Sequence, residues 1–164
     1  MKKLLTTIFV LCFGLSVMAA EPAAEQWNAM DLGFWFGVPA SMKTANVHGW
    51  RIGWPICAGE GTVRGFESGI FCAATDNIEG FQMSFGVTRA KELTGLQMAI
   101  VNICCNEVVG SQIGVVNVAG KRGWQIGLVN TSTNAKLQLG LINVNKDGLM
   151  PFSIILNLGR DTFK

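Results

Sequence analysis

The chain has 164 residues, of which 49% are hydrophobic and 15% charged, and its mean hydropathy is +0.36. Its length suits a single domain. The formal net charge of +2 disappears without Lys2 and Lys3. We therefore expect no nucleic acid partner, because proteins that bind polyanions carry a clear excess of basic residues.

Residues 1–20 carry the pattern of a secretory signal peptide. Lys2 and Lys3 form a basic start, Leu4–Val17 an apolar segment, and Ala19-Ala20 the small residues of a cleavage point. The apolar run is shorter than the about 20 residues that a membrane-spanning helix needs. We therefore expect export through the inner membrane, which places the protein in the periplasm, in the outer membrane or at the cell surface.

A short unit of the form Gly-x-Gln-aliphatic-Gly-aliphatic-aliphatic-Asn fills most of the remaining chain. Its clearest copies are GLQMAIVN (95–102), GSQIGVVN (110–117), GWQIGLVN (123–130) and LQLGLIN (137–143). Weaker copies lie at 49–56, 65–72, 80–87 and 150–157. The central polar position recurs every 13 to 16 residues, at Arg51, Glu67, Gln82, Gln97, Gln112, Gln125 and Gln138. Self-similarity at a short, nearly fixed period is typical of a repeat architecture.

Each unit alternates with a period of two residues, which predicts a β-strand. One face is continuously hydrophobic, as at Ile126 and Leu128, and we expect it to form a dry core. The other face is small and half polar, as at Gln125 and Gly127. No helical stripe follows residue 46, so the sequence predicts an almost entirely β protein.

The near identity of the copies favours a parallel β-solenoid with coils of about 13–16 residues, because stacking rewards the same residue at each position. Eight such coils at roughly 4.8 Å each would form a rod on the order of 40 Å long. The alternative is an antiparallel meander or a small β-barrel, including an outer-membrane barrel. The solenoid predicts two structural ladders of stacked amides, formed by Gln82, Gln97, Gln112, Gln125 and Gln138, and by Asn102, Asn117, Asn130 and Asn143.

Three further segments follow from the position of the repeats. We expect residues 21–46 to form an N-terminal cap, residues 47–158 the β-repeat domain, and residues 159–164 a C-terminal tail. Terminal repeats are atypical because their outer face meets water. The apolar run after Pro151 is expected to close the far end.

Four of the five cysteines lie beyond the leader, where an oxidising compartment would allow disulfides. Cys57 and Cys72 are about one repeat apart and form a candidate disulfide, although their positions within the repeat differ by one. The alternative is that the thiols remain reduced and pack as small hydrophobic groups.

The sequence contains no recognisable catalytic or metal-binding pattern. His48 is the only histidine, no zinc-ligand spacing occurs, and carboxylates are not grouped on one strand face. We therefore expect no enzyme activity, no cofactor and no metal. Lys121, Arg122, Lys136 and Lys146 lie between strands, where they form either part of a binding face or an ordinary solubilising rim.

Three segments carry a resemblance to a known family: 46–53 (NVHGWRIG), the core from Gly95 to Asn143, and 148–157 (GLMPFSIILN). In these segments the chain resembles a family of uncharacterised bacterial surface-repeat proteins, first noted in spirochaetes, with tandem GLQIGLVN-type units behind a signal peptide. It departs from that pattern at Met98-Ala99 and in its cysteines. The resemblance implies export and surface exposure, and it implies no reaction.

Together these observations predict an exported, non-enzymatic repeat protein of the cell surface or envelope, with a structural or binding role and an unknown partner there. The alternative is a small outer-membrane barrel, the one case in which we expect contact with a membrane.

Overall fold

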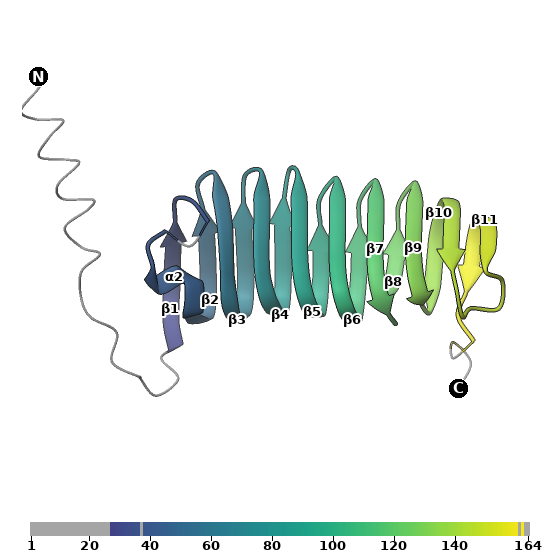
Figure 1. Ribbon diagram of the computed structural model, residues 1–164, viewed down its shortest axis with the longest axis horizontal. Coiled ribbons are helices and arrows are strands. Elements are labelled where there is room, and N and C mark those ends of the chain that lie inside the picture. Colours follow the sequence, from purple (N-terminus) through teal and green to yellow (C-terminus); the bar gives the residue numbers. More distant parts are fainter. Residues whose placement is uncertain (1–26, 37, 161, 163–164) are drawn as a thin grey trace, which may run out of the picture.

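The computed structural model describes residues 27–36, 38–160 and 162. The expected signal peptide, residues 1–20, lies outside this part of the chain. The described chain forms a parallel β-solenoid of about eight turns and not a barrel, as Figure 1 shows. The predicted fold class is therefore confirmed.

The coils are built from long strands in the first half of the solenoid and from shorter strands in the second half. No helix among the described residues is long and apolar enough to cross a membrane. All strand pairs are parallel except the last, β10 with β11. The elements are β1 (Trp27–Gly33), α2 (Ser41–Thr44), β2 (Asn46–Gly53), β3 (Ile56–Gly69), β4 (Cys72–Ser84), β5 (Val87–Met98), β6 (Val101–Ile113), β7 (Val116–Lys121), β8 (Trp124–Ile126), β9 (Val129–Asn134), β10 (Leu137–Asn145) and β11 (Phe152–Leu158).

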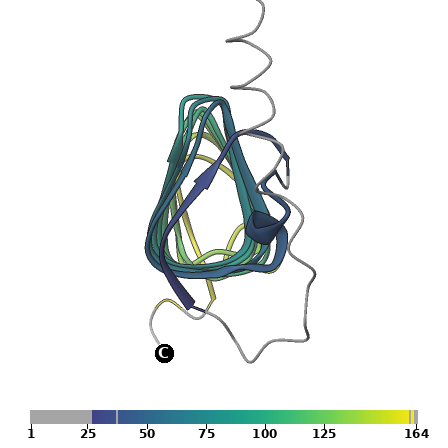
Figure 2. The same cartoon turned by 90° about the vertical axis from the view of Figure 1, so that its left-hand side faces the viewer.

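Seen along the long axis, the coils superpose into a triangular tube that narrows to one corner (Figure 2). We call this bend the narrow corner. It lies between one strand and the next, for example between Met98, where β5 ends, and Val101, where β6 begins. The opposite, wider side of the tube contains the register shifts, such as the one between Ala90 and Glu92.

The repeat positions stack in register from coil to coil. Gln97 lies opposite Gln112 in the β5–β6 pair, and Asn117 lies opposite Asn130 in the β7–β9 pair. Parallel in-register pairing places each amide over its own kind, which is the arrangement that makes amide ladders stable. This pairing explains why the copies of the unit resemble one another so closely.

The two glycines of the unit are required by close packing. Gly95 has φ +132°, and a Cβ there would lie 1.9 Å from the carbonyl oxygen of Gly80 in the preceding coil. A Cβ at Gly127, inside the narrow corner, would lie 2.5 Å from Nδ2 of Asn117. The first glycine permits a backbone conformation that other residues rarely adopt, and the second leaves space for a buried amide.

The amide face of the unit lies inside the solenoid, and the aliphatic face, which was expected to form a dry core, lies outside. Gln125 and Asn130 are fully buried, whereas Ile126 and Leu128 are 41% and 51% exposed. The expected position of the aliphatic face is therefore wrong. Two backbone walls converge at the narrow corner, and their inward carbonyl groups need donors that amides supply and aliphatic side chains lack.

The apolar interior lies farther from the narrow corner. Its residues lie either before the glutamine position of the unit, on the stretch of chain that runs toward the corner, or after its asparagine position, on the stretch that leaves it. It is formed by Val47, Val63, Ile78, Ala90, Leu93, Cys104, Val108 and Ala119. The solenoid thus has a conventional apolar core on its wide side and a polar interior at its narrow side.

The first described segment closes the N-terminal end of the tube. β1 pairs in parallel with β2 and so adds a further strand to the stack. Met42 of α2 is fully buried in a cluster with Cys57 and Ala73. Residues 27–36 and 38–46 of the expected N-terminal cap therefore comprise a strand of the stack and a short helical plug.

The C-terminal end closes differently from the expectation. β11 runs antiparallel to β10, and Asn157 lies opposite Gln138 rather than over the asparagine ladder. Ser153 and Asn157 face inward, while Phe152 and Ile154 are exposed. The reversal of the chain ends the stack, and the apolar side chains after Pro151 do not plug it.

The stacked amides predict a clear stability effect for Gln112→Met. The substitution leaves Oε1 of Gln97 without its donor and Nε2 of Gln125 without its acceptor. Since each buried unsatisfied polar group costs about 1–3 kcal/mol, the free energy of unfolding should fall by about 2–4 kcal/mol in urea denaturation.

Ser111→Ala is the matched control, because Ser111 precedes Gln112 and points out of the same strand. We expect this control to change stability little. If both variants unfold at the wild-type urea concentration, the glutamine ladder does not stabilise the fold.

Candidate interaction surface and the ladders beneath it

The glutamine ladder is continuous through five coils. From Gln97 onward, each side-chain Nε2 donates to Oε1 of the glutamine in the preceding coil. Nε2 of Gln112 donates to Gln97 at 2.8 Å, and Nε2 of Gln125 donates to Gln112 at 2.9 Å. Every ladder glutamine except Gln97 also spans the interior, as Nε2 of Gln125 does by donating to the carbonyl of Thr131 at 3.2 Å. The ladder therefore ties neighbouring coils together and joins two walls of the same coil.

The asparagine ladder has the opposite direction. Nδ2 of Asn117 donates to Oδ1 of Asn130 in the following coil at 2.8 Å, and also to the carbonyl of Ile126 at 2.9 Å. The ladder begins with the Thr88 hydroxyl, which donates to Oδ1 of Asn102 at 2.6 Å. It ends at Asn143, which donates to the carbonyl of Gly140. These bonds link the two walls directly beneath the narrow corner.

A buried carboxylate receives the donor end of the glutamine ladder. Oε2 of Glu67 accepts from Nε2 of Gln82 at 2.6 Å, and its other oxygen accepts from the Thr75 hydroxyl and, at 3.2 Å, from the Cys57 thiol. Burial is the largest influence on Glu67 and raises its pKa. The hydrogen bonds from Thr75 and Gln82 and the charge of Arg51 oppose that rise.

Arg51 and Asp31 extend this polar column toward the N-terminal end. Nη1 of Arg51 donates to Thr75 at 3.0 Å, and Nη2 donates to the carbonyl of Ala45 at 2.6 Å. Nε of Arg51 lies 3.6 Å from Oδ2 of Asp31, which makes an ion pair without a hydrogen bond. Both side chains are buried, so the cluster is enclosed and offers no open site to a ligand.

The four cysteines in the described part of the chain are free, and the candidate disulfide between Cys57 and Cys72 is not formed. Cys57 lies opposite Ala73, one position from Cys72. A shift of one residue turns a side chain to the other face of a strand, so Cys57 points inward and Cys72 lies on the outer face. The one-position difference visible in the sequence was the signal against this pairing.

Above the amide ladders, aliphatic side chains cover the outside of the narrow corner. They form three adjoining columns, one before the bend, one at it and one after it. We call these columns, in coil order, the apolar edge: Met83, Met98, Ile113, Ile126 and Leu139; Phe85, Ile100, Val115, Leu128 and Leu141; and Val87, Val101, Val116, Val129 and Ile142. None of these residues is charged.

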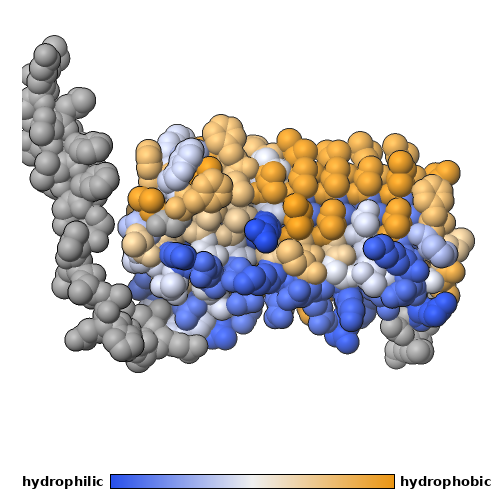
Figure 3. Space-filling view, in the orientation of Figure 1, coloured by the Kyte–Doolittle hydropathy of each residue, from blue (hydrophilic) through white to orange (hydrophobic). Residues whose placement is uncertain are grey.

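The apolar edge is continuous along the molecule, whereas charged residues lie on the wide side. Figure 3 shows this as an upper hydrophobic band over a lower hydrophilic margin. Ion pairs between neighbouring coils contribute to that margin. They include Arg64 with Glu79 at 2.7 Å and Lys91 with Asp76 at 2.6 Å. The rod is therefore amphipathic about its long axis.

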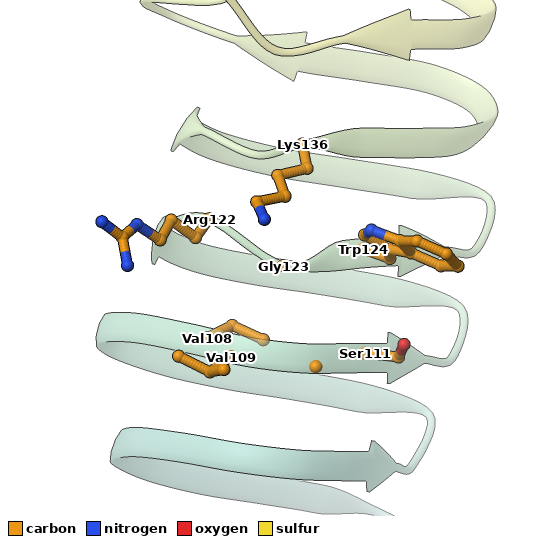
Figure 4. Close-up of a pocket in the computed structure, with 8 residues that line it drawn as sticks. Val108, Val109, Ser111, Arg122, Gly123, Trp124 and Lys136 are labelled. Atoms are coloured by element: carbon orange, nitrogen blue, oxygen red, sulfur yellow. The ribbon is translucent and has the colours of Figure 1, made fainter. Parts of the chain in front are cut away.

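A shallow depression of about 330 Å³ lies beside the apolar edge, between β6 and β8 (Figure 4). Trp124, Arg122 and Lys136 line it together with Val109. The Trp124 side chain is 52% exposed, and Arg122 pairs with Glu107 at 2.8 Å. This arrangement places the amphipathic Trp124 ring at the border of the edge, with Lys136 and then Arg122 farther from the narrow corner (Figure 4).

The predicted ladder residues and the predicted basic residues lie in different parts of the structure. The Gln and Asn positions are buried and cannot contact a partner, while Lys121, Arg122, Lys136 and Lys146 remain on the surface. His48 is exposed on β2. No group of His, Cys, Asp or Glu in the described part of the chain could hold a metal ion. The apolar edge was not predicted as a surface, although its aliphatic columns are visible in the repeat.

Comparison of the chain with known protein families, curated proteins and solved structures finds no match.

Glu67→Gln tests the buried carboxylate through pH dependence. Because burial raises the pKa of Glu67 in the folded state above its ordinary value of 4.5, the folded protein binds this proton more tightly than the unfolded chain. The associated stability is fully present below about pH 4.5 and is lost as the pH rises through the folded-state pKa. The variant should lose this decline, measured as the free energy of unfolding at a series of pH values. Identical pH profiles for the two proteins would contradict the assignment.

Thiol reactivity tests the placement of the cysteines. Cys105 is exposed and should react first with a thiol reagent at neutral pH, while the buried Cys57 and Cys104 should react only on unfolding. Burial raises the pKa of Cys104 to about 12 and so suppresses its thiolate. Cys105→Ser should remove the fast phase alone. Recovery of a Cys57–Cys72 disulfide from the exported protein would contradict this arrangement.

Proposed function

We propose that the protein is an exported, non-enzymatic repeat protein that serves as a structural or binding element of the cell surface or envelope, and that it binds through the apolar edge. The observation that carries the proposal is the in-register exposure of uncharged aliphatic side chains along the solenoid. Large contiguous apolar patches are uncommon on monomeric soluble proteins and mark interaction sites.

The interior supports a structural role for the buried polar residues. The ladder amides donate to one another and to backbone carbonyls, and Glu67 is enclosed by Thr75, Gln82 and Cys57. Catalytic groups need access to a substrate, whereas these groups are fully buried. The proposal therefore assigns them to stability and assigns binding to the outer surface.

Export is supported by the leader pattern at residues 1–20 and by the resemblance to bacterial surface-repeat proteins. The parallel strands of the stack exclude the barrel alternative. A solenoid presents a long surface on a rigid frame, a geometry that repeat proteins use for contact with partners.

Expression of the full chain in a Gram-negative bacterium tests export. We expect a processed form whose N-terminus follows Ala19 or Ala20, found outside the cytoplasm. A chain that retains Met1–Ala20 and remains in the cytoplasm would contradict the proposal.

Substitution of the edge tests its role in the same cells. Ile126→Ser with Leu128→Ser should release the exported protein from the sedimenting envelope fraction into the soluble fraction, because both side chains are exposed and neither supports the interior. Leu149→Ser is the matched control, since Leu149 is 56% exposed but lies in the loop between β10 and β11. If the edge variant sediments as the wild type does, the envelope contact does not use the edge.

A further inference from the structure

We propose that the apolar edge docks on an anionic lipid surface, where its side chains enter the boundary between headgroups and acyl chains without crossing the membrane. This inference rests on the proposed function and names the partner of the same surface. It differs from the sequence-based expectation, which confined membrane contact to a barrel.

The shape of the edge favours a deformable partner. The columns of the apolar edge lie before, at and after the bend, so apolar side chains lie on both flanks of the convex corner whose backbone Figure 2 shows. Figure 3 shows one of these flanks. A second rigid copy would cover one flank of such a corner and leave the other in water. A fluid lipid layer closes around both flanks, and amphipathic elements enter it to a depth of roughly 5–10 Å.

The composition of the edge matches the acyl boundary. Its bend carries Ile100, Val115, Leu128 and Leu141, which are 56%, 41%, 51% and 60% exposed. Beneath them, the asparagine ladder already satisfies backbone carbonyls of the corner, as Asn117 does for Ile126. The edge can therefore leave water while these carbonyls keep their hydrogen-bond donors. Backbone groups at membrane depth must be hydrogen-bonded within the protein.

The border of the edge carries groups suited to headgroups. Trp124 has an apolar body with a polar N–H, a combination that favours the membrane interface. Lys136 and Arg122 line the same depression, with Arg122 at the end farthest from Trp124 (Figure 4), and Arg89 is on the other flank, opposite Ile103. No ion pair between described residues includes Lys136, so its charge remains available to a phosphate.

The second half of the solenoid carries a net positive charge. From Val101, where β6 begins, to Arg160 the chain has five basic residues, namely Lys121, Arg122, Lys136, Lys146 and Arg160, against two acidic residues, Glu107 and Asp147. This gives a formal net charge of +3. Basic residues near anionic lipids strengthen binding in a salt-dependent way. Of the two cations that line the depression beside the edge, Arg122 pairs with Glu107, whereas Lys136 has no ion pair with a described acidic residue.

Vesicle flotation of the protein purified after export tests the inference. The probes are vesicles of phosphatidylethanolamine with phosphatidylglycerol, and vesicles of phosphatidylcholine alone. We expect the wild type to float with the anionic vesicles, and to float less with phosphatidylcholine or at high salt. Leu128→Ser with Leu141→Ser should weaken binding at least about tenfold, because two half-exposed leucines lose their transfer into the acyl boundary.

Two further variants separate this effect from misfolding and from charge alone. Leu149→Ser should bind as the wild type does, and circular dichroism should show the same β content for all variants. Arg122→Gln with Lys136→Gln should reduce the preference for anionic vesicles while leaving the weaker binding to phosphatidylcholine unchanged.

Three outcomes would overturn the inference. The wild type floats with neither kind of vesicle although it fractionates with the envelope, in which case the edge binds a protein and the proposed function survives. The edge variant floats as well as the wild type, so that another surface binds lipid. The wild type is a dimer, the edge variant is a monomer, and neither protein floats, so that a second copy covers the edge. Failure of the proposed function itself would appear separately, as a failure of export or as an edge variant that still sediments with the envelope.

Discussion

The fold depends on the continuous stacking of buried amides beneath the narrow corner. An amide that donates to the next coil must find another amide, or an equivalent acceptor, at the same position. Each coil therefore constrains its neighbours, and the constraint is met by in-register pairs such as Gln112 with Gln125 and Asn117 with Asn130. Low local dielectric strengthens such chains of hydrogen bonds and also makes any interruption costly. The repeat in the sequence is the direct consequence.

Each ladder of amides also has two ends, and the hydrogen bonds there are completed in different ways. Glu67 has only acceptors when ionised, so it receives Nε2 of Gln82 without presenting a further donor. Thr88 begins the asparagine ladder with its hydroxyl. At the far end, Oε1 of Gln138 has no hydrogen-bond partner among the described residues, and the antiparallel β11 ends the stack there. The less regular coils at either end thus reflect the chemistry of termination.

The sequence favoured the solenoid over a meander or barrel and marked the repeated amide positions, because both follow from the identity of stacked copies. It did not establish which face of each strand points into the interior. Alternation at Gln125 and Ile126 separates two faces but does not say which is inside. Aliphatic residues usually lie inside a protein. That rule fails here because the two backbone walls converge at the narrow corner, and their inward carbonyl groups need hydrogen-bond donors that the amides supply. The same inversion turns a supposed core into the apolar edge. The reversal of β11 also lay beyond the repeat pattern, since Asn157 mimics the ladder asparagine while facing Gln138.

Side-chain amide hydrogen exchange, followed by nuclear magnetic resonance of the ¹⁵N-labelled protein, tests the central claim that the amides are inside and the aliphatic residues outside. The account predicts slow exchange for the side-chain NH₂ groups of Gln97, Gln112, Gln125, Asn117 and Asn130, since each is buried and donates within a ladder. Exchange of these groups at the rate of free amides in an otherwise folded protein would contradict the account, because it would place the amides in water and return the aliphatic residues to the core.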